Sequence, residues 1–419
     1  LNRTSVAAYH NYNYLIMMQN LSDHLVEKEK KGKIRQRLWK VRAKKVILAT
    51  GSIERPMVFD CNDRPGIMLS SAVRKYINYY GVKCGNKVVI FTNNDYAYQT
   101  AIDFKLLDTF IKVMVVDLRN NSKGDLIEEA RALGVHTLFN HIITNTKGRN
   151  KINSVFVHKI EEETNEIIDN YGKVPCDLLC VSGGWTPTVH LFSQSKGKLF
   201  YRESDATFIP EKSFQNEISI GACNGTFELD EILKETHTKI SGLLTEFGKK
   251  IDEESRLSSE KIFYDKLKHL WIVPSNKHFG KTKMFVDFQN DVTAKDIKLA
   301  LREGYRSIEH IKRYTTTGMA TDQGKIGNIN ALGIISKLSG IPVHELGTTT
   351  FRLPYTPVTF GALAGRHIKE FFDVERTTPI HQWHVDNGAE FENVGQWKRA
   401  WYYPKENEDM HQAVNREVK

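Results

Sequence analysis

The chain has 419 residues, 40% of them hydrophobic and 26% charged, which is typical of a soluble globular protein with room for several domains. It contains no apolar run of the ~20 residues that span a bilayer, and it opens with neither an initiator Met nor a signal segment, so we expect a cytoplasmic protein or a fragment of one, with no membrane partner. Lys and Arg exceed Asp and Glu by nine (59 − 50), but they are spread along the chain, so we expect no nucleic-acid partner.

The five cysteines are few and unpatterned, which predicts reduced thiols. Cys176 and Cys180 fall on one expected strand, 176–181, where four residues of strand separate their Cα atoms by about 13 Å. That distance is too long for a disulfide or a shared metal. We expect both to be buried apolar side chains, and the chain lacks a C-x-x-C redox pair.

The first 56 residues predict short strands and a ligand-facing turn. A strand at 5–9 is followed by two hairpin strands, 23–26 and 36–41, around the lysine-rich loop 28–33. A β-branched strand then ends in Ala-Thr-Gly, where glycine allows backbone to approach a ligand closely. The candidate cofactor-binding residues of this first lobe are Val6, Ala49, Thr50 and Gly51.

A second α/β unit follows an expected helix at 70–80. Its strand (87–91), helix (95–107) and second strand (112–117, ending in Asp117) have the order of a Rossmann unit. The turn at 92–96 contains no glycine, and its side chains would obstruct a pyrophosphate. We therefore expect this lobe to have the Rossmann fold without the usual nicotinamide site.

Two later strands also end in glycine. One runs into Gly183-Gly184, and the other, 217–225, precedes a helix that begins at Leu229. We call the three strand-to-glycine turns, in chain order, the first, second and third glycine exits. In flavoprotein reductases, the element at the place of the third exit brings backbone amides to the phosphates of a dinucleotide. We predict a dinucleotide site built from the first and third exits. The candidates at the third exit are Gly221, Ala222, Cys223 and Asn224.

A charged helical linker is expected from about 238 to 284, followed by a small helical module. Thr293 and Asp296 form a capping box for one helix, and 307–315 predicts a second. The module resembles the [2Fe–2S] domain of bacterioferritin-associated ferredoxins. The positions that match its cluster cysteines are Asp287, Gln289, Asp322 and Gly327. None of the four is a thiolate, so we expect no metal.

Together these features resemble the large (α) subunits of heterotetrameric sarcosine oxidases. The stretches that carry the resemblance are 37–56, 91–95, 182–185, 286–293, 318–325 and 354–361. The resemblance implies an α/β, two-lobed fold like that of flavoprotein disulfide reductases, a cluster-less ferredoxin-like module, and the start of an aminomethyltransferase-like, folate-binding domain. The implied segments are 1–80 and 183–237 (first lobe), 81–182 (second lobe), 238–284 (helical linker), 285–345 (module) and 346–419 (lead-in to the folate domain).

The resemblance further implies oxidative demethylation of sarcosine to glycine, with transfer of the one-carbon unit to tetrahydrofolate and production of H2O2. This chain would hold NAD, FMN would lie at the α–β interface, and FAD would be bound by the partner β subunit beside γ and δ subunits. No catalytic residue is assigned here. Residues 313–316 and Lys325 face either the interface flavin or solvent. The alternatives are a related amine, opine or proline dehydrogenase complex, and a non-catalytic scaffold subunit.

Overall fold

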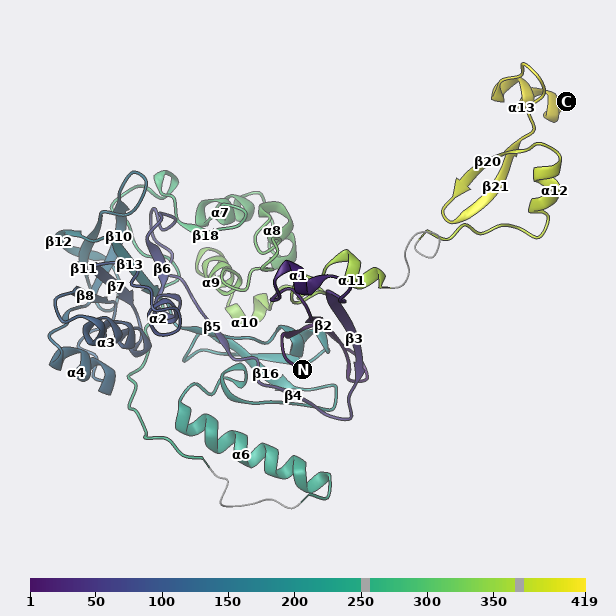
Figure 1. The fold of residues 1–419 in the computed structure, drawn as a ribbon. Helices are drawn as coiled ribbons and strands as arrows, with labels where there is room; N and C mark the ends of the chain where they lie inside the picture. The colour runs from purple at the N-terminus through teal and green to yellow at the C-terminus, as the bar shows by residue number, and fades with distance from the viewer. Residues whose placement is uncertain (250–256, 366–372) are drawn as a thin grey trace. The chain divides into compact units, whose positions relative to one another are not determined.

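The computed structural model describes residues 1–249, 257–365 and 373–419 (Figure 1). Its contacts divide the chain into two compact units. The smaller consists of 1–5, 16–40 and 357–419, and the larger of 6–15 and 41–356. Among the described residues, no helix has both the length and the apolar character needed to cross a membrane. All the candidate site residues lie in the larger unit.

The larger unit is organised around a five-stranded parallel sheet, in the order β6-β13-β7-β8-β9. Its strands are Ile67–Leu69 (β6), Lys87–Thr92 (β7), Lys112–Asp117 (β8), His136–Phe139 (β9) and Leu178–Ser182 (β13). Alternate residues of β7 enter two cores, because side chains of a strand point to opposite faces in turn. Val88 and Ile90 pack with helices, whereas Val89 and Phe91 pack with a second sheet.

Three helices cover one face of this sheet and an antiparallel sheet covers the other (Figure 1). The helices are α2 (Ser70–Asn78), α3 (Tyr98–Leu107), with the short η1 (Asp95–Ala97) before it, and α4 (Asp125–Ala132). The antiparallel strands are β10 (His141–Lys147), β11 (Ser154–Ile160) and β12 (Ile167–Pro175). The strand, helix and strand expected of a Rossmann unit are confirmed.

The first lobe contains short paired strands and one long helix. β4 (Val46–Leu48) pairs in parallel with β17 (Glu217–Ser219), and β5 (Ser52–Glu54) pairs antiparallel with β14 (Trp185–Pro187). The other elements of this region are α5 (His190–Gln194), β15 (Lys198–Arg202), β16 (Thr207–Lys212), η2 (Gly221–Asn224) and α6 (Leu229–Glu246).

The expected helical module is present and has its own core. Its elements are η4 (Phe279–Lys281), β18 (Phe285–Asp287), β19 (Val292–Thr293), α7 (Ala294–Arg302), α8 (Ile308–Thr315), α9 (Asn328–Ser339) and α10 (Val343–Leu346). Thr293 and Asp296 form the predicted capping box of α7. The apolar helix α9 supplies most of the buried side chains, including Ile334 and Ile335. Together with the parallel-sheet lobe, this confirms the predicted fold class.

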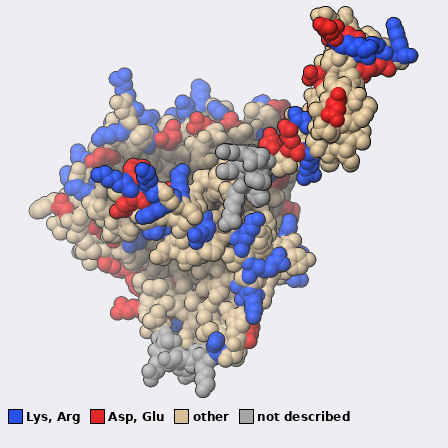
Figure 2. Space-filling view, turned by 45° about the vertical axis from the view of Figure 1, so that its right-hand side comes forward, with Lys and Arg blue, Asp and Glu red and all other residues tan. Residues whose placement is uncertain are grey.

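Further strands and helices lie near the two ends of the chain. β1 (Thr4–His10), β2 (Tyr14–Asn20) and β3 (Gln36–Arg42) form a three-stranded sheet. The remaining elements are α1 (Glu27–Lys30), α11 (Phe360–Ala364), α12 (His381–Asp386), β20 (Glu390–Val394), β21 (Trp397–Tyr402) and α13 (Met410–Val418). On the face drawn in Figure 2, basic and acidic side chains are scattered among uncharged ones.

Two predictions about secondary structure were wrong. Residues 23–26 are not a strand: Leu25 N–H donates to Ser22 O in a turn, and α1 takes up part of the expected lysine loop. The linker expected to be helical from 238 to 284 is helical only to Glu246 and again in the short η4. Residues 257–278 contain no helix, because part of their backbone bonds to the second lobe instead. Residues 250–256 of that linker lie outside the described residues.

The buried cysteines confirm another expectation. Cys176 and Cys180 are 2% and 0% exposed, and all five cysteines are free thiols. Burial is the main cause that raises the pKa of both thiols, Cys176 to about 12. They therefore act as small apolar side chains of the sheet core.

Candidate functional site

The first and third glycine exits leave the same edge of one parallel strand pair. Val46 of β4 lies opposite Glu217 of β17, and Leu48 lies opposite Ser219. One residue later, Ile220 N–H donates to Leu48 O at 3.0 Å. Ligands of α/β folds bind beyond the carboxyl ends of parallel strands. The structure therefore brings Ala49-Thr50-Gly51 and Gly221-Ala222-Cys223-Asn224 together, as the first-and-third-exit hypothesis requires.

The second exit fixes the position of the first. After β14 the chain reaches Thr188, whose N–H donates to Gly51 O at 2.9 Å. The Thr50 hydroxyl donates in return to Thr188 O at 2.8 Å. Sequence reasoning did not single out Thr188, since this partner lies 138 residues from Thr50. The two hydrogen bonds hold the Thr50–Gly51 turn rigid.

The first and third exits each contain a glycine in a backbone conformation that other residues rarely adopt. Gly51 has φ +70° and Gly221 has φ +69°, in the left-handed region. A Cβ added to Gly51 would meet no atom within 4 Å, whereas one on Gly221 would lie 3.4 Å from Ile232 Cγ2. Open space therefore lies beside Gly51, where a ligand can approach the backbone.

The third exit is braced by a carboxylate from α6 that sequence reasoning missed. Glu235 accepts hydrogen bonds from Gly221 N–H at 2.9 Å and from the Asn224 amide at 2.6 Å. Lys239 donates to the same carboxylate at 2.7 Å. Partial burial alone would raise the pKa of Glu235, but these contacts and a hydrogen bond from Thr226 hold it below its ordinary value. The amide of Gly221 is thus already engaged.

The other proposed residues differ in how accessible they are. Cys223 is buried, with its thiol 3.0 Å from Leu48 O, whereas Ala222 is half-buried. Val6, on β1, accepts a hydrogen bond from the Thr356 hydroxyl at 3.4 Å. The hydrogen bonds recorded for the described residues connect Val6 to that segment and not to Gly51 or Gly221.

A cavity of about 910 Å³ lies elsewhere in the larger unit. Its walls include the cations Lys196 and Arg352 and the hydroxyl-rich stretch 348–350, and no described Asp or Glu lines it. Gln194 links its sides, accepting from Tyr9 N–H at 3.3 Å and donating to Arg352 O at 3.2 Å. Positive charge without a facing carboxylate suits an anionic ligand.

A buried histidine stands next to this cavity. His190 is 5% exposed, its Nδ1 has no hydrogen-bond partner, and its ring lies 4.2 Å from that of Phe351. Burial, helped by the charge of Lys325, lowers the pKa of His190 to about 4. Lys325 itself donates to Tyr355 O at 2.7 Å and lies 4.1 Å above the Tyr355 ring. Lys325 is therefore half-buried in the structure, whereas Arg313 is exposed.

The positions that match cluster cysteines have other structural roles. The Asp287 carboxylate accepts from Gln289 N–H at 2.9 Å and from Gly318 N–H at 2.7 Å, so it joins two loops. A Cβ at Gly327 would lie 2.4 Å from Val286 O, which leaves no room for a side chain there. Within the described ranges, no group of three or more His, Cys, Asp or Glu is arranged to hold a metal ion.

Comparison with known proteins supports this picture. Residues 281–366 match the family model of the sarcosine oxidase A3 domain. The chain is 39% identical over 424 residues to sarcosine oxidase subunit alpha of Corynebacterium sp. (strain P-1), covering 100% of this chain and 43% of that protein. It is 36% identical over 425 residues to the protein of the same name from Rhizobium meliloti (strain 1021), covering 99% and 40%. The chain spans less than half the length of these relatives.

Among solved structures, L-proline dehydrogenase from P. horikoshii has a similar fold, with a TM-score of 0.60 and 20% identity. The match covers 86% of this chain and 64% of that chain. At this identity the similarity concerns the fold alone. The resemblance expected from the sequence motifs is confirmed: this chain is similar along its whole length to the α subunits of sarcosine oxidases.

Proposed function

We propose that the protein acts as the α subunit of a heterotetrameric sarcosine oxidase, an oxidoreductase that acts on CH–NH donors. The proposed complex oxidatively demethylates sarcosine to glycine, passes the one-carbon unit to tetrahydrofolate and produces H2O2. The observation that carries this proposal is the 39% identity along the whole chain to a sarcosine oxidase α subunit. The proposed partners are β, γ and δ subunits, and the proposed location is the cytoplasm.

NAD is assigned to the paired glycine exits of the first lobe. The adjacent carboxyl ends of β4 and β17 support this assignment, as does the open space beside Gly51. Thr50 would hold the turn in place through Thr188, and the backbone around Gly51 would approach the dinucleotide. Since Gly221 N–H already donates to Glu235, the first exit offers the freer side of the site.

The interface flavin, FMN, is assigned to the cationic cavity. Lys196 and Arg352 would neutralise the phosphate, and the hydroxyls of 348–350 would donate hydrogen bonds to it. FAD, which would accept electrons from the amine, is assigned to the partner β subunit. Tetrahydrofolate is assigned to the aminomethyltransferase-like domain to which 346–419 would lead.

The test is to express the full-length α chain with and without its partner subunits. Mass spectrometry of the purified complex identifies the cofactors, and a peroxide assay follows sarcosine oxidation. We expect peroxide only when the β subunit is present. Equal activity from α alone would show that the amine is oxidised in the α subunit and would contradict the assignment to the β subunit. Activity with proline or an opine, but not with sarcosine, would instead assign a related dehydrogenase complex, and no turnover with any amine would indicate a scaffold.

A matched pair of glycine variants tests the NAD site directly. Gly51 and Gly134 have similar φ values, +70° and +74°, and neither has an atom within 4 Å of an added Cβ. Gly51→Ala and Gly134→Ala should therefore strain the backbone equally. We expect only Gly51→Ala to lower NAD affinity, by about tenfold, which corresponds to roughly 1.4 kcal/mol. Equal NAD content in both variants would move the site away from Gly51.

A further inference from the structure

Residues 263–268, here named the strap, lie at the carboxyl ends of β7 and β8. Asp265 N–H donates to the Asp95 carboxylate at 2.7 Å, and the Asp265 carboxylate accepts from Lys123 N–H at 3.0 Å. Asp95 stands in the turn after β7, and Lys123 follows β8. The strap therefore crosses the edge of the sheet at which open α/β folds bind nucleotides.

Both ends of the strap are fixed by paired hydrogen bonds. Phe263 N–H donates to the Asp125 carboxylate at 2.7 Å, and Asp125 N–H donates to Phe263 O at 3.1 Å. At the other end, the Asn93 amide donates to Lys268 O at 2.8 Å and Lys268 N–H donates to Asn93 O at 3.3 Å. Partners some 140 and 175 residues away thus hold both ends of the strap in place.

An aromatic contact holds the Tyr264 part of the strap against the second lobe. The ring of Tyr264 stacks on that of Tyr96, with centroids 4.5 Å apart and an interplanar angle of 23°. Tyr96 is in the glycine-free turn, at the position where a Rossmann turn normally approaches a pyrophosphate. The Tyr96 side chain, which would obstruct a nucleotide, is therefore the one that contacts the strap.

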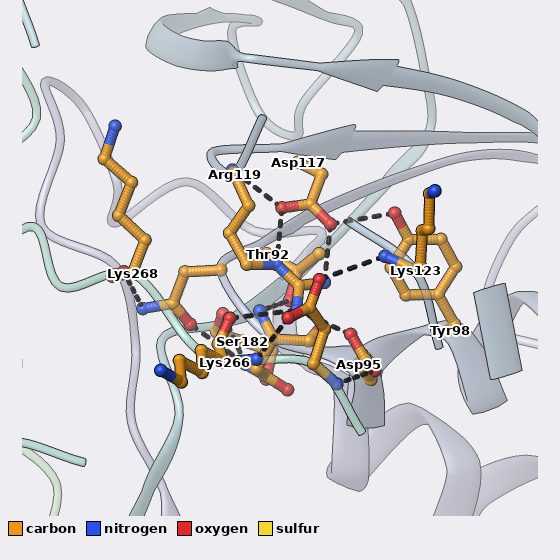
Figure 3. Close-up of polar contacts among 12 residues, drawn as sticks. Thr92, Asp95, Tyr98, Asp117, Arg119, Lys123, Ser182, Lys266 and Lys268 are labelled. Atoms are coloured by element: carbon orange, nitrogen blue, oxygen red, sulfur yellow. Dashed lines mark hydrogen bonds and ion pairs between the residues drawn. The ribbon is translucent and has the colours of Figure 1, made fainter. Parts of the chain in front are cut away.

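The acid that ends β8 is also unavailable to a nucleotide. Asp117 has the position of the carboxylate that binds a ribose hydroxyl in Rossmann folds. It is fully buried and accepts hydrogen bonds from the Tyr98 hydroxyl and the Arg119 guanidinium, both at 2.8 Å (Figure 3). Arg119 bridges to Asp95 at 2.5 Å as well. The Asp95 carboxylate would repel a phosphate at the turn that normally carries it.

We propose that the strap is a built-in ligand of the second α/β lobe: it occupies the nucleotide crevice of that lobe, which accepts no dinucleotide while the strap is seated. The lobe then serves as a docking site for the chain's own segment between α6 and the helical module. This inference does not depend on where NAD binds in the first lobe.

Hydrogen exchange measured by mass spectrometry on the full-length complex tests the seating of the strap. The variant is Tyr264→Ala, and Tyr305→Ala is the control, since Tyr305 makes a comparable ring contact with Tyr314 at 4.8 Å. Loss of the Tyr96 contact should speed exchange of the 263–268 amides about tenfold, with β10–β12 unchanged. The Tyr305 variant should leave the strap as it is. Unchanged strap exchange in Tyr264→Ala would contradict the proposal.

A second measurement uses the unmodified protein and needs no variant to fold. Millimolar NADH or ADP-ribose is added while exchange is followed in two regions, the strap with 92–95 and the exits at 49–51 and 221–224. We expect no change in the first region. Faster strap exchange together with slower exchange at 92–95 would show a nucleotide displacing the strap and would overturn the proposal. Slower exchange at the exits alone reports on the NAD site of the first lobe.

Discussion

The Glu235 carboxylate accepts a hydrogen bond from the backbone N–H of Gly221, with 2.9 Å between Oε2 and N. This contact and a second one from the Asn224 amide tie helix α6 to the third glycine exit. Lys239, on the same helix, donates to the Glu235 carboxylate as well. An acidic side chain thus stabilises a turn that sequence alone assigns to phosphate binding.

Glu235→Gln should lower the free energy of unfolding at pH 7 by about 1 kcal/mol, because the charge-assisted contacts to a partly buried carboxylate are lost. The folded-state pKa of Glu235 is below its ordinary value, so its stabilisation is present above that value and is lost as pH falls through the folded pKa. The difference from wild type should therefore close in acid. Urea unfolding at several pH values measures this difference in stability. Glu246→Gln on the same helix is the control. It should change stability little, because Glu246 is largely exposed and lies 3.7 Å from its partner Lys45.

Arg119→Met should cost about 3–5 kcal/mol of unfolding free energy, since two buried carboxylates, Asp95 and Asp117, lose their shared cation. Arg131→Met is the control, because Arg131 makes an exposed ion pair with Glu128 that contributes less than about 1 kcal/mol. Chemical denaturation of both variants compares them. A similar small loss in both would mean that the buried cluster contributes no more than a surface pair.

Two helix-interior glycines should respond in opposite ways to alanine. A Cβ at Gly333 in α9 would lie 2.0 Å from Cδ2 of Trp271, whereas one at Gly242 in α6 would meet nothing within 4 Å. We expect Gly333→Ala to destabilise by about 1–3 kcal/mol through overpacking. Gly242→Ala should stabilise by about 1 kcal/mol through helix propensity. Thermal and urea unfolding report both, and a stabilised Gly333→Ala would show that Trp271 moves freely.

Unfolding of the protein should depend on His190 between about pH 4 and pH 6.5. Burial lowers the pKa of His190 to about 4, so in that range the unfolded chain takes up a proton that the folded chain does not. Stability therefore falls as pH falls through this window. His190→Gln should remove up to about 3 kcal/mol of that dependence. His136→Gln, at an exposed position, is the control, and identical pH profiles for wild type and His190→Gln would refute the expectation.

Locally encoded features were predicted well from sequence. The apolar run of β7, the strand that ends in Asp117 and the Thr293–Asp296 capping box each depend on residues within a few positions of one another. The resemblance to sarcosine oxidase α subunits rests in the same way on short motifs in order. The three glycine exits were found because glycine after a strand is a local signal.

Contacts between distant residues were decided by the tertiary structure. Thr188 beside Gly51, Glu235 beneath Gly221 and the strap on the second lobe involve partners that no local pattern connects. Residues 257–268 have the charged composition of a helix, yet they form neither helix nor strand. Backbone amides must find partners, and carboxylates some 140–170 residues away supply them at lower cost than a solvent-exposed helix. Sequence thus determined the elements and the resemblance to sarcosine oxidase α subunits, and the tertiary structure decided which polar groups remain free to bind a ligand.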